Sequence, residues 1–166
     1  KMVKTLLDMS ELQTVSRDET IAVDALVDEV LVDLEPLAQE KEIKLIGNCK
    51  DTTMVGSDIL IYRMVYNLVE NAIKYNRFGG QVTVTAYQKG KNICLSVEDT
   101  GSGIPDELKE WVFEPFFRVD KSRSRELGGV GLGLALVREI VRVHDGSITV
   151  QSGSSGGTVF DVVFKQ

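Results

Sequence analysis

A long amphipathic helix that leads directly into two alternating strands constrains the fold of this chain most. Ser57 or Asp58 can cap a helix that continues to about Asn76. Its apolar side chains recur at helical spacing and form one buried face: Ile61, Met64, Val65, Leu68, Ala72 and Ile73. Alternating strands follow near 82–86 and 93–97. A helix with one apolar face beside such strands predicts a two-layer α/β sandwich.

The segments before this helix alternate in the same way. Residues 1–14 have apolar positions at roughly helical spacing, and residues 20–23 suit a short strand. Asp24 can cap a helix that continues to about residue 41. Pro36 lies inside that helix and predicts a kink or a break. Two further short strands are expected at 43–47 and 52–55.

A long stretch without clear periodicity separates this part from the last elements. It runs from Thr100 to about Gly131, with one short helical piece near 105–112. A loop of this length inside a compact domain is usually functional or mobile. A helix over 132–144 follows it. Two last strands, at 147–152 and 158–164, complete an apparently antiparallel meander.

Composition limits the classes of function that this chain can have. With 166 residues it is long enough for one domain with a real core. A hydrophobic content of 43% argues against disorder, and a net charge of −6 disfavours nucleic acid or an anionic membrane as partner. Cys49 and Cys94 have no metal-binding spacing, which favours reduced thiols in a cytosolic protein. The chain begins inside a helical pattern, so we expect a fragment of a longer protein.

Polar side chains at the edge of the 58–76 helix suggest a nucleotide site. Asn67, Asn71 and Lys74 stand at i, i+4 and i+7 and share one face. The amide oxygen of Asn71 suits Mg²⁺, a cation that prefers oxygen ligands. Lys74 can neutralise phosphate, and Tyr75 can lie against a base. Each residue also has an ordinary interpretation: backbone-capping amides, a solvated lysine and a core aromatic.

Asp99 is the second candidate, because it follows a strand and precedes Gly101 and Gly103. A carboxylate there can accept a hydrogen bond from an exocyclic amino group such as that of adenine. Guanine has a carbonyl at the equivalent position, so the carboxylate would discriminate against it. The alternative interpretation is a common Asp-Gly turn.

A third candidate is the glycine-rich sequence GGVGLGLA at 128–135, which opens a helix. The N–H groups at such a helix start can bind phosphates. The sequence is neither a P-loop nor a dinucleotide fingerprint, because both spacings fail. A plain capping turn would need fewer glycines than the four found in these first six residues.

Five ordered motifs together resemble a known family. NLVENAIKY, VEDTGSGIP, FEPFFRVD, GGVGLGLALV and GSSGGTVF are similar to the N, G1, F, G2 and G3 boxes of sensor histidine kinases. The resemblance is to their catalytic ATP-binding domain, a member of the gyrase, chaperone, kinase and MutL superfamily. It covers about 20–166. It implies a Bergerat fold, in which a mixed sheet packs on about three helices, with ATP and Mg²⁺ as cofactors and a lid over about 104–130.

The resemblance also implies roles for single residues. Asp99 would bind adenine, and Asn71 would bind Mg²⁺ with support from Asn67. Asn67, Lys74 and Arg118 would be the catalytic residues. The remaining nucleotide contacts would come from Tyr75, Gly101, Gly103, Ile104, Phe117, Gly129, Val130, Gly131, Leu132, Gly133, Leu134 and Thr158. The lid would have Phe113, Phe116 and Phe117 as anchors and Arg118, Lys121, Arg123 and Arg125 as cations.

The resemblance implies a phosphoacceptor histidine on a separate helical dimerisation domain, and residues 1–19 would be the tail of that domain. His144 is the chain's one histidine. It follows the last helix, where we expect it to complement the helix dipole and not to accept phosphate. A response regulator receiver domain is the other implied partner. The parent would be a homodimer in the bacterial cell membrane, and this fragment a cytoplasmic monomer that does not bind nucleic acid.

Other functions of the same superfamily remain open at this point. Hydrolytic members resemble this chain but have a glutamate four residues before the metal asparagine, where this chain has Asn67. An amide cannot act as a general base, so we expect slow hydrolysis. An ATPase or clamp domain, a serine kinase of the anti-sigma type and a nucleotide-sensing scaffold are the alternatives.

Overall fold

The computed structural model describes residues 12–115, 117 and 133–166. Most of the expected helix at 1–14 and most of the expected lid lie outside these residues. The elements, in chain order, are η1 (Leu12–Thr14), β1 (Glu19–Ala22), α2 (Val23–Glu40), β2 (Lys44–Cys49), β3 (Thr53–Gly56), α3 (Asp58–Lys74), β4 (Gln81–Lys89), β5 (Asn92–Asp99), η2 (Asp106–Leu108), α5 (Gly133–Val143), β6 (Gly146–Ser152) and β7 (Thr158–Lys165).

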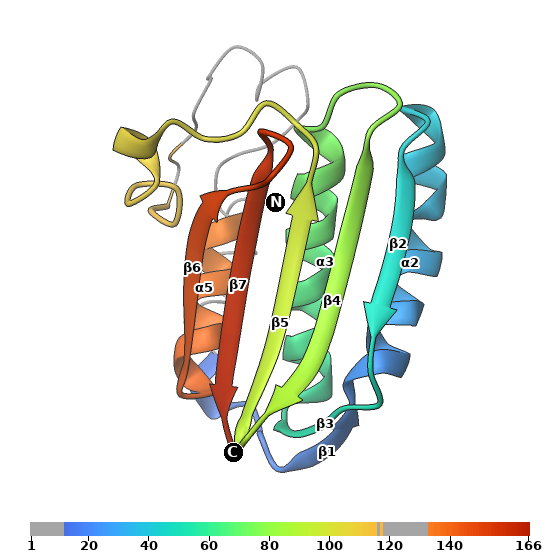
Figure 1. The fold of residues 1–166 in the computed structure, drawn as a ribbon. Coiled ribbons are helices and arrows are strands. Elements are labelled where there is room, and N and C mark those ends of the chain that lie inside the picture. Colours follow the sequence, from blue (N-terminus) through green and yellow to red (C-terminus); the bar gives the residue numbers. More distant parts are fainter. Residues whose placement is uncertain (1–11, 116, 118–132) are drawn as a thin grey trace.

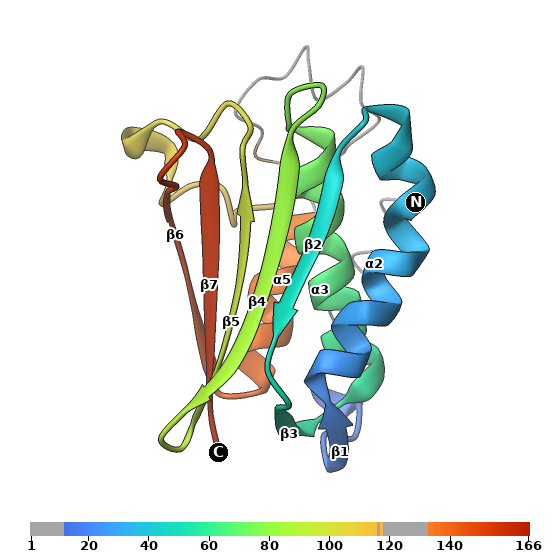
Figure 2. The same ribbon diagram turned by 45° about the vertical axis from the view of Figure 1, so that its right-hand side comes forward.

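Two layers make up the structure, as predicted. A five-stranded sheet has the order β2-β4-β5-β7-β6, and helices α2, α3 and α5 cover one of its faces (Figure 1). Strands β1 and β3 form a separate two-stranded sheet at one end (Figure 2). None of the described helices is long and apolar enough to cross a membrane.

The sheet is mixed, which confirms the fold that the resemblance implied, and the expected meander is antiparallel only in part. Strands β4, β5, β7 and β6 pair antiparallel, as expected. Strand β2 pairs parallel with β4, because the chain returns through α3 before it enters β4. A parallel pair requires such a crossover, which a hairpin cannot supply.

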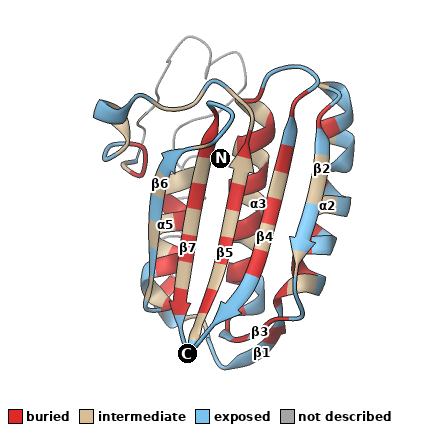
Figure 3. Ribbon diagram, viewed as in Figure 1, coloured by how far each residue is buried: buried red, intermediate tan, exposed pale blue. Residues whose placement is uncertain are grey.

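Alternation along the strands separates the two faces of the sheet. In β5, every second residue is buried under the helices and the residues between are partly exposed. Figure 3 shows the same alternation along β7. The helices contribute matching apolar stripes, with Met64 and Leu68 of α3 fully buried. Leu12 of η1 packs in the same core and is 2% exposed.

Helix α2 differs from expectation in two ways. It begins at Val23, with Ala22 as N-cap, so Asp24 lies in the first turn instead of capping it. Strand β1 uses the preceding residues for pairing with β3, which fixes the chain direction at the helix start. The helix also continues through Pro36 without a break. Pro36 and Val32 are exposed, so water can reach the Val32 carbonyl that proline leaves without its helical partner.

The end of α2 is a tight turn that needs a left-handed residue. The Ile43 N–H donates to the Ala38 carbonyl at 2.9 Å, and the Glu42 N–H donates to the Gln39 carbonyl at 3.1 Å. This pair of bonds defines a Schellman motif, whose left-handed position usually has glycine. Glu42 occupies it with φ 53°. Lys41, directly before it, is thereby set at the helix end.

The start of α3 is held by two side chains. Ser57 caps the helix, as predicted, by accepting from the Leu60 N–H at 3.3 Å. The Ser57 N–H donates to Nε2 of His144 at 3.0 Å, and Nδ1 of His144 lies 2.8 Å from the Ile140 carbonyl. One nitrogen accepts and the other must donate, so the ring is neutral.

His144 therefore corrects the expectation of a cation at the helix end. It meets a carbonyl of the last turn of α5, but as a buried neutral ring that is 9% exposed. Burial lowers the pKa of His144, and the positive charge of Arg17 lowers it further. The hydrogen bond to Ile140 and the charge of Asp145 act in the opposite direction. His144 is thus a neutral link between α5 and the start of α3.

We predict that acid destabilises the fold through His144. Because the folded-state pKa lies below the unfolded value of about 6.5, the unfolded chain binds the proton more readily. The free energy of unfolding should therefore fall as the pH drops below about 6.5, by at most about 1.4 kcal/mol per pH unit, and level off below the folded-state pKa. Urea unfolding between pH 7.5 and 5.5 measures this slope. His144→Gln should remove most of it, and an equal slope in that variant would contradict the assignment.

Candidate nucleotide-binding site

Asp99 ends β5 as a fixed and nearly buried carboxylate. It is 8% exposed, and its Oδ1 accepts from the Gly101 N–H at 2.9 Å and from the Thr158 N–H at 3.2 Å. Oδ2 accepts no hydrogen bond from the described residues, and it is not among their fully buried unpartnered atoms. One oxygen therefore orients the group and the other is available to a ligand.

The electrostatics of this group are compatible with a neutral donor. Burial raises the pKa of the Asp99 carboxyl, and the two backbone N–H groups offset part of this effect. A further donor at Oδ2 would favour the ionised form, because hydrogen bonds to a carboxylate stabilise its charge. An exocyclic amino group provides such a donor without adding a formal charge.

Close backbone contacts surround Asp99, and glycines permit two of them. A Cβ on Gly157 would lie 1.9 Å from the Asp99 carbonyl oxygen, and a Cβ on Gly101 would lie 2.4 Å from the Tyr75 carbonyl oxygen. The turn before β7 and the end of α3 therefore both reach the backbone around Asp99. Side chains at these two positions would separate the three segments.

A polar network that the sequence did not indicate joins α3 to the sheet at this point. Asn76 is 1% exposed, its Nδ2 donates to the Gln81 carbonyl at 3.0 Å, and its Oδ1 accepts from the Thr100 hydroxyl at 3.0 Å. The Thr100 hydroxyl oxygen also accepts from the Gln81 N–H at 3.0 Å. Asn76 directly follows Tyr75, and Thr100 directly follows Asp99. This position beside predicted site residues was the one sequence signal that could have indicated them.

The predicted polar face of α3 is present. Asn67, Asn71 and Lys74 are all half-buried on this helix. Lys74 Nζ lies 3.8 Å from Glu70 Oε1, so a helical neighbour partly compensates its charge. A Cβ on Gly133 would lie 3.9 Å from Asn67 Oδ1, which places the start of α5 opposite Asn67.

The other predicted residues lie at the end of α3, beside the turn before β7, against the core or outside the described residues. Tyr75 caps the end of α3, and its N–H donates to the Asn71 carbonyl at 3.1 Å. Gly103 has φ 76° and lies against the Gly156 carbonyl, so it also adjoins the turn before β7. Partly buried against the core are Ile104, Phe117 and Leu134. Outside the described residues are Phe116, Arg118, Lys121, Arg123, Arg125, Gly129, Val130, Gly131 and Leu132.

The described start of the expected lid is attached to the core. Phe113 is 9% exposed and packs edge-to-face on Phe160 of β7, with ring centroids 5.9 Å apart. Glu114 Oε1 lies 3.3 Å from Arg138 Nη1 of α5. The helical piece expected near 105–112 is shorter, a single 3₁₀ turn over Asp106–Leu108 followed by turns.

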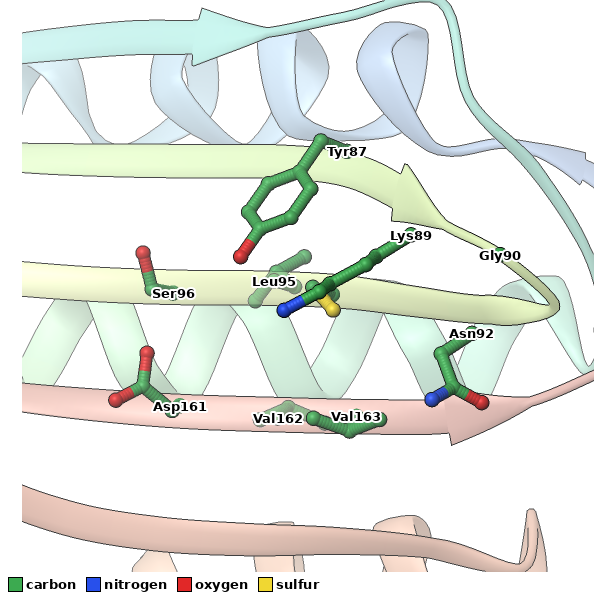
Figure 4. A pocket seen from close by; sticks show the side chains of 10 residues that line it. Tyr87, Lys89, Gly90, Asn92, Leu95, Ser96, Asp161, Val162 and Val163 are labelled. Atoms are coloured by element: carbon green, nitrogen blue, oxygen red, sulfur yellow. The ribbon is translucent and has the colours of Figure 1, made fainter.

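A shallow hollow lies on the opposite face of the sheet and is separate from this site. Figure 4 shows it in front of β4, β5 and β7, with the helices behind the strands. Tyr87, Lys89 and Asp161 are among its lining residues. It contains none of the residues predicted to bind a nucleotide.

The side chains near α3 could supply only part of the ligand set of a cation, and phosphate and water would supply the rest. Among the described residues, no three His, Cys, Asp or Glu side chains are grouped to hold a metal. Asparagine amides are neutral oxygen donors of the kind that Mg²⁺ accepts beside phosphate and water. Asn71 therefore fits a site shared with phosphate and water better than a site whose ligands all come from the protein.

Comparison with known proteins agrees with this arrangement. Residues 56–166 match the family described as histidine kinase-, DNA gyrase B- and HSP90-like ATPase. The chain therefore belongs to this ATPase family. Its relatives are sensor histidine kinases, and its fold is similar to the catalytic domain of such a kinase.

One such relative is the sensor-like histidine kinase SenX3 of Mycolicibacterium smegmatis, which is 37% identical over 163 residues, 96% of this chain and 42% of that protein. The catalytic domain of histidine kinase ThkA has 27% identity and a TM-score of 0.80, covering 90% of this chain and 96% of that chain. ThkA in complex with the response regulator protein TrrA has 26% identity and a TM-score of 0.80, and the match covers 99% of this chain and 46% of that chain. The chain thus spans less than half of the length of SenX3.

We predict that Gly157→Ala disrupts the site more than Gly156→Ala. The added methyl group at Gly157 meets the Asp99 backbone, so the variant should lose about 3 kcal/mol of unfolding free energy or more. Gly156 has open space but φ 87°, so alanine there should cost roughly 1–2 kcal/mol. Thermal unfolding of both variants measures the difference. Equal losses would show that the close approach at Gly157 does not matter.

Proposed function

We propose that this domain binds Mg–ATP and transfers the γ-phosphoryl group to a histidine on a separate helical domain. The observation that carries this proposal is the buried Asp99, whose Oδ1 is held by two backbone N–H groups while Oδ2 is left to a ligand. The adenine amino group fits that oxygen, and guanine would present a carbonyl to it.

The remaining roles follow from position along α3 and the adjoining turns. The base would be lined or supported by Tyr75, Gly101, Gly103, Ile104 and Thr158. Asn71 offers an amide oxygen to Mg²⁺, which would neutralise phosphate charge when bound. Lys74 lies one turn beyond Asn71 and supplies a positive charge for the phosphates. The backbone from Gly129 to Leu134, with Phe117 and Arg118, completes the phosphate end in this proposal.

The reaction requires mainly positioning and charge neutralisation from the protein. The bond between the β-γ bridging oxygen and the γ-phosphorus breaks, ADP leaves, and a bond forms from an imidazole nitrogen of the acceptor to the γ-phosphorus. Asn67, Lys74 and Arg118 stabilise charge during this transfer. The acceptor comes from outside the described domain, because His144 is buried and both of its ring nitrogens have partners.

Hydrolysis is the second candidate function, and the structure offers it little support. Asn67 faces the start of α5 and cannot act as a base. Glu70 is the nearest carboxylate on the helix, and it lies 3.8 Å from Lys74. Glu70 is also adjacent to Asn71 in sequence, so it points about 100° away from Asn71 around the helix. Phosphoryl transfer to a better nucleophile than water therefore fits this site.

The proposal extends to the parent protein and its partners. Residues 1–19 would end the helical dimerisation and phosphoacceptor domain, and residues 20–166 would form the catalytic domain. The complex of ThkA with TrrA supports a response regulator receiver domain as a further partner. We place the parent as a homodimer in the bacterial cell membrane, with this domain on the cytoplasmic side.

Calorimetric titration with ATP should separate the roles of Asp99 and Asn71. Asp99→Asn leaves one carbonyl oxygen to serve two backbone donors and adenine, so ATP affinity should fall by about tenfold or more with or without Mg²⁺. Asn71→Ala should weaken Mg–ATP more than Mg-free ATP. GTP should bind poorly to the unmodified chain. Unchanged affinity in Asp99→Asn, or equal losses with and without Mg²⁺ in Asn71→Ala, would contradict these roles.

Incubation with γ-labelled ATP tests the reaction itself. The domain alone should hydrolyse ATP far below about 1 s⁻¹, a low rate for an enzyme. Addition of a separately prepared acceptor-helix domain should place acid-labile label on that domain, as expected for phosphohistidine. Rapid release of free phosphate without any labelled partner would favour the ATPase alternative.

A further inference from the structure

Helix α3 ends beside a lysine from another helix. Helices α2 and α3 lie side by side with their C-terminal ends at the same end of the molecule, where β5 also ends (Figure 2). Lys41 closes α2 and is half-buried. Its Nζ donates to the carbonyls of Ile73 at 3.3 Å, Lys74 at 2.8 Å and Asn76 at 2.9 Å.

Ile73 and Lys74 lie in the last turn of α3, and Asn76 lies just beyond it. The Ile73 carbonyl also accepts from the Asn76 N–H at 3.2 Å. The last turn of a helix has carbonyls without intrahelical partners and a partial negative charge, and an ammonium group satisfies both. Lysine has three N–H donors, which matches the three carbonyls. The Lys41 backbone binds the same region, because the Gly79 N–H, in the turn after α3, donates to the Lys41 carbonyl at 2.9 Å.

The residue after Lys41 adopts a left-handed backbone conformation, and the turn that it closes sets the position of Lys41. Glu42 has φ 53°, a conformation that L side chains rarely adopt. This residue closes the Schellman turn that directs the chain from α2 into β2. The turn sets Lys41 at the end of α3, where an ordinary surface lysine would be free to extend into water.

The end of α3 that Lys41 holds is also one wall of the site. Tyr75 lies between the bonded carbonyls of Lys74 and Asn76, and its own carbonyl lies against Gly101. The Gly101 N–H in turn orients Asp99 at 2.9 Å. Three consecutive contacts therefore connect the ammonium group to the carboxylate that we assign to adenine: the bonds from Lys41 to the end of α3, the approach of the Tyr75 carbonyl to Gly101, and the bond from Gly101 to Asp99.

We propose that Lys41 is a positioning residue, which holds the end of α3 against the Asp99 turn and so sets the geometry of the nucleotide site. This inference rests on the proposed function of that site. Lys41 touches neither the base nor the phosphates in this proposal. It acts through the backbone of Lys74, Tyr75 and Asn76.

The test replaces the ammonium group and keeps the aliphatic stem. Lys41→Met should weaken ATP binding by about tenfold, measured by calorimetry well below the unfolding transition. Lys41→Arg keeps several donors and the charge, so its affinity should stay within about threefold of the unmodified chain. Lys44→Met is the matched control, because Lys44 is exposed three residues further on, and it should bind ATP normally.

Amide hydrogen exchange without nucleotide provides an independent measurement. In Lys41→Met, exchange at Tyr75, Asn76 and Gly79 should become about tenfold faster, while Val84 and Val97 in the sheet centre keep their protection. A lysine that merely adds stability would change the unfolding temperature but not the ATP affinity. Lys41→Gln replaces Lys41→Met in both measurements if the methionine variant does not fold.

The outcomes separate this inference from the proposed function. If the unmodified chain fails to bind ATP, the proposed function is wrong, and exchange at the end of α3 still decides whether Lys41 holds that segment. If ATP binds normally to a folded Lys41→Met, or if exchange at Tyr75 and Asn76 is unchanged, Lys41 is not a positioning residue.

Discussion

The two backbone hydrogen bonds to Oδ1 of Asp99 are the interaction on which the rest of this site depends. They come from Gly101 in the turn after β5 and from Thr158 at the start of β7, segments far apart in sequence. A buried carboxylate without such partners would be costly. With them, the group is fixed in direction and retains one oxygen for recognition. In the proposed function, base recognition would thus use a group that also joins two strands.

Backbone contacts determine the geometry around Asp99. The Asp99 and Tyr75 carbonyls lie so close to Gly157 and Gly101 that no side chain fits at either glycine. Asn76 and Thr100 then connect the same backbone segments to Gln81. Packing at this density allows little adjustment. Variation in this region should therefore affect stability and binding together, whereas changes on the outer face of the sheet need not.

Features that depend on neighbouring residues, such as helix caps and strand alternation, could be predicted from the sequence. The helix capped by Ser57 and the alternation of β5 followed from residue types in their expected places. That Thr158 lies near Asp99 was implied only by the resemblance to the kinase motifs. Long-range choices did not follow. The parallel pairing of β2 depends on the crossover through α3, and Lys41 looks like any surface lysine until the end of α3 lies beside it. The neutrality of His144 required its partner Ser57, which is 87 residues away.

The amide of Asn67, where hydrolytic members of the superfamily have a glutamate, favours phosphoryl transfer over hydrolysis in the proposed function. An ATPase must activate water inside its own site, so it needs a carboxylate near the γ-phosphate. Here Asn67 occupies the position of that group, and Glu70 is paired with Lys74. A site that binds ATP rigidly and activates water poorly preserves the phosphoryl group until a stronger nucleophile arrives. In the proposed function, an imidazole on a neighbouring domain would be such a nucleophile, and its approach would decide when transfer occurs. Control of the reaction would then depend on the relative position of the two domains.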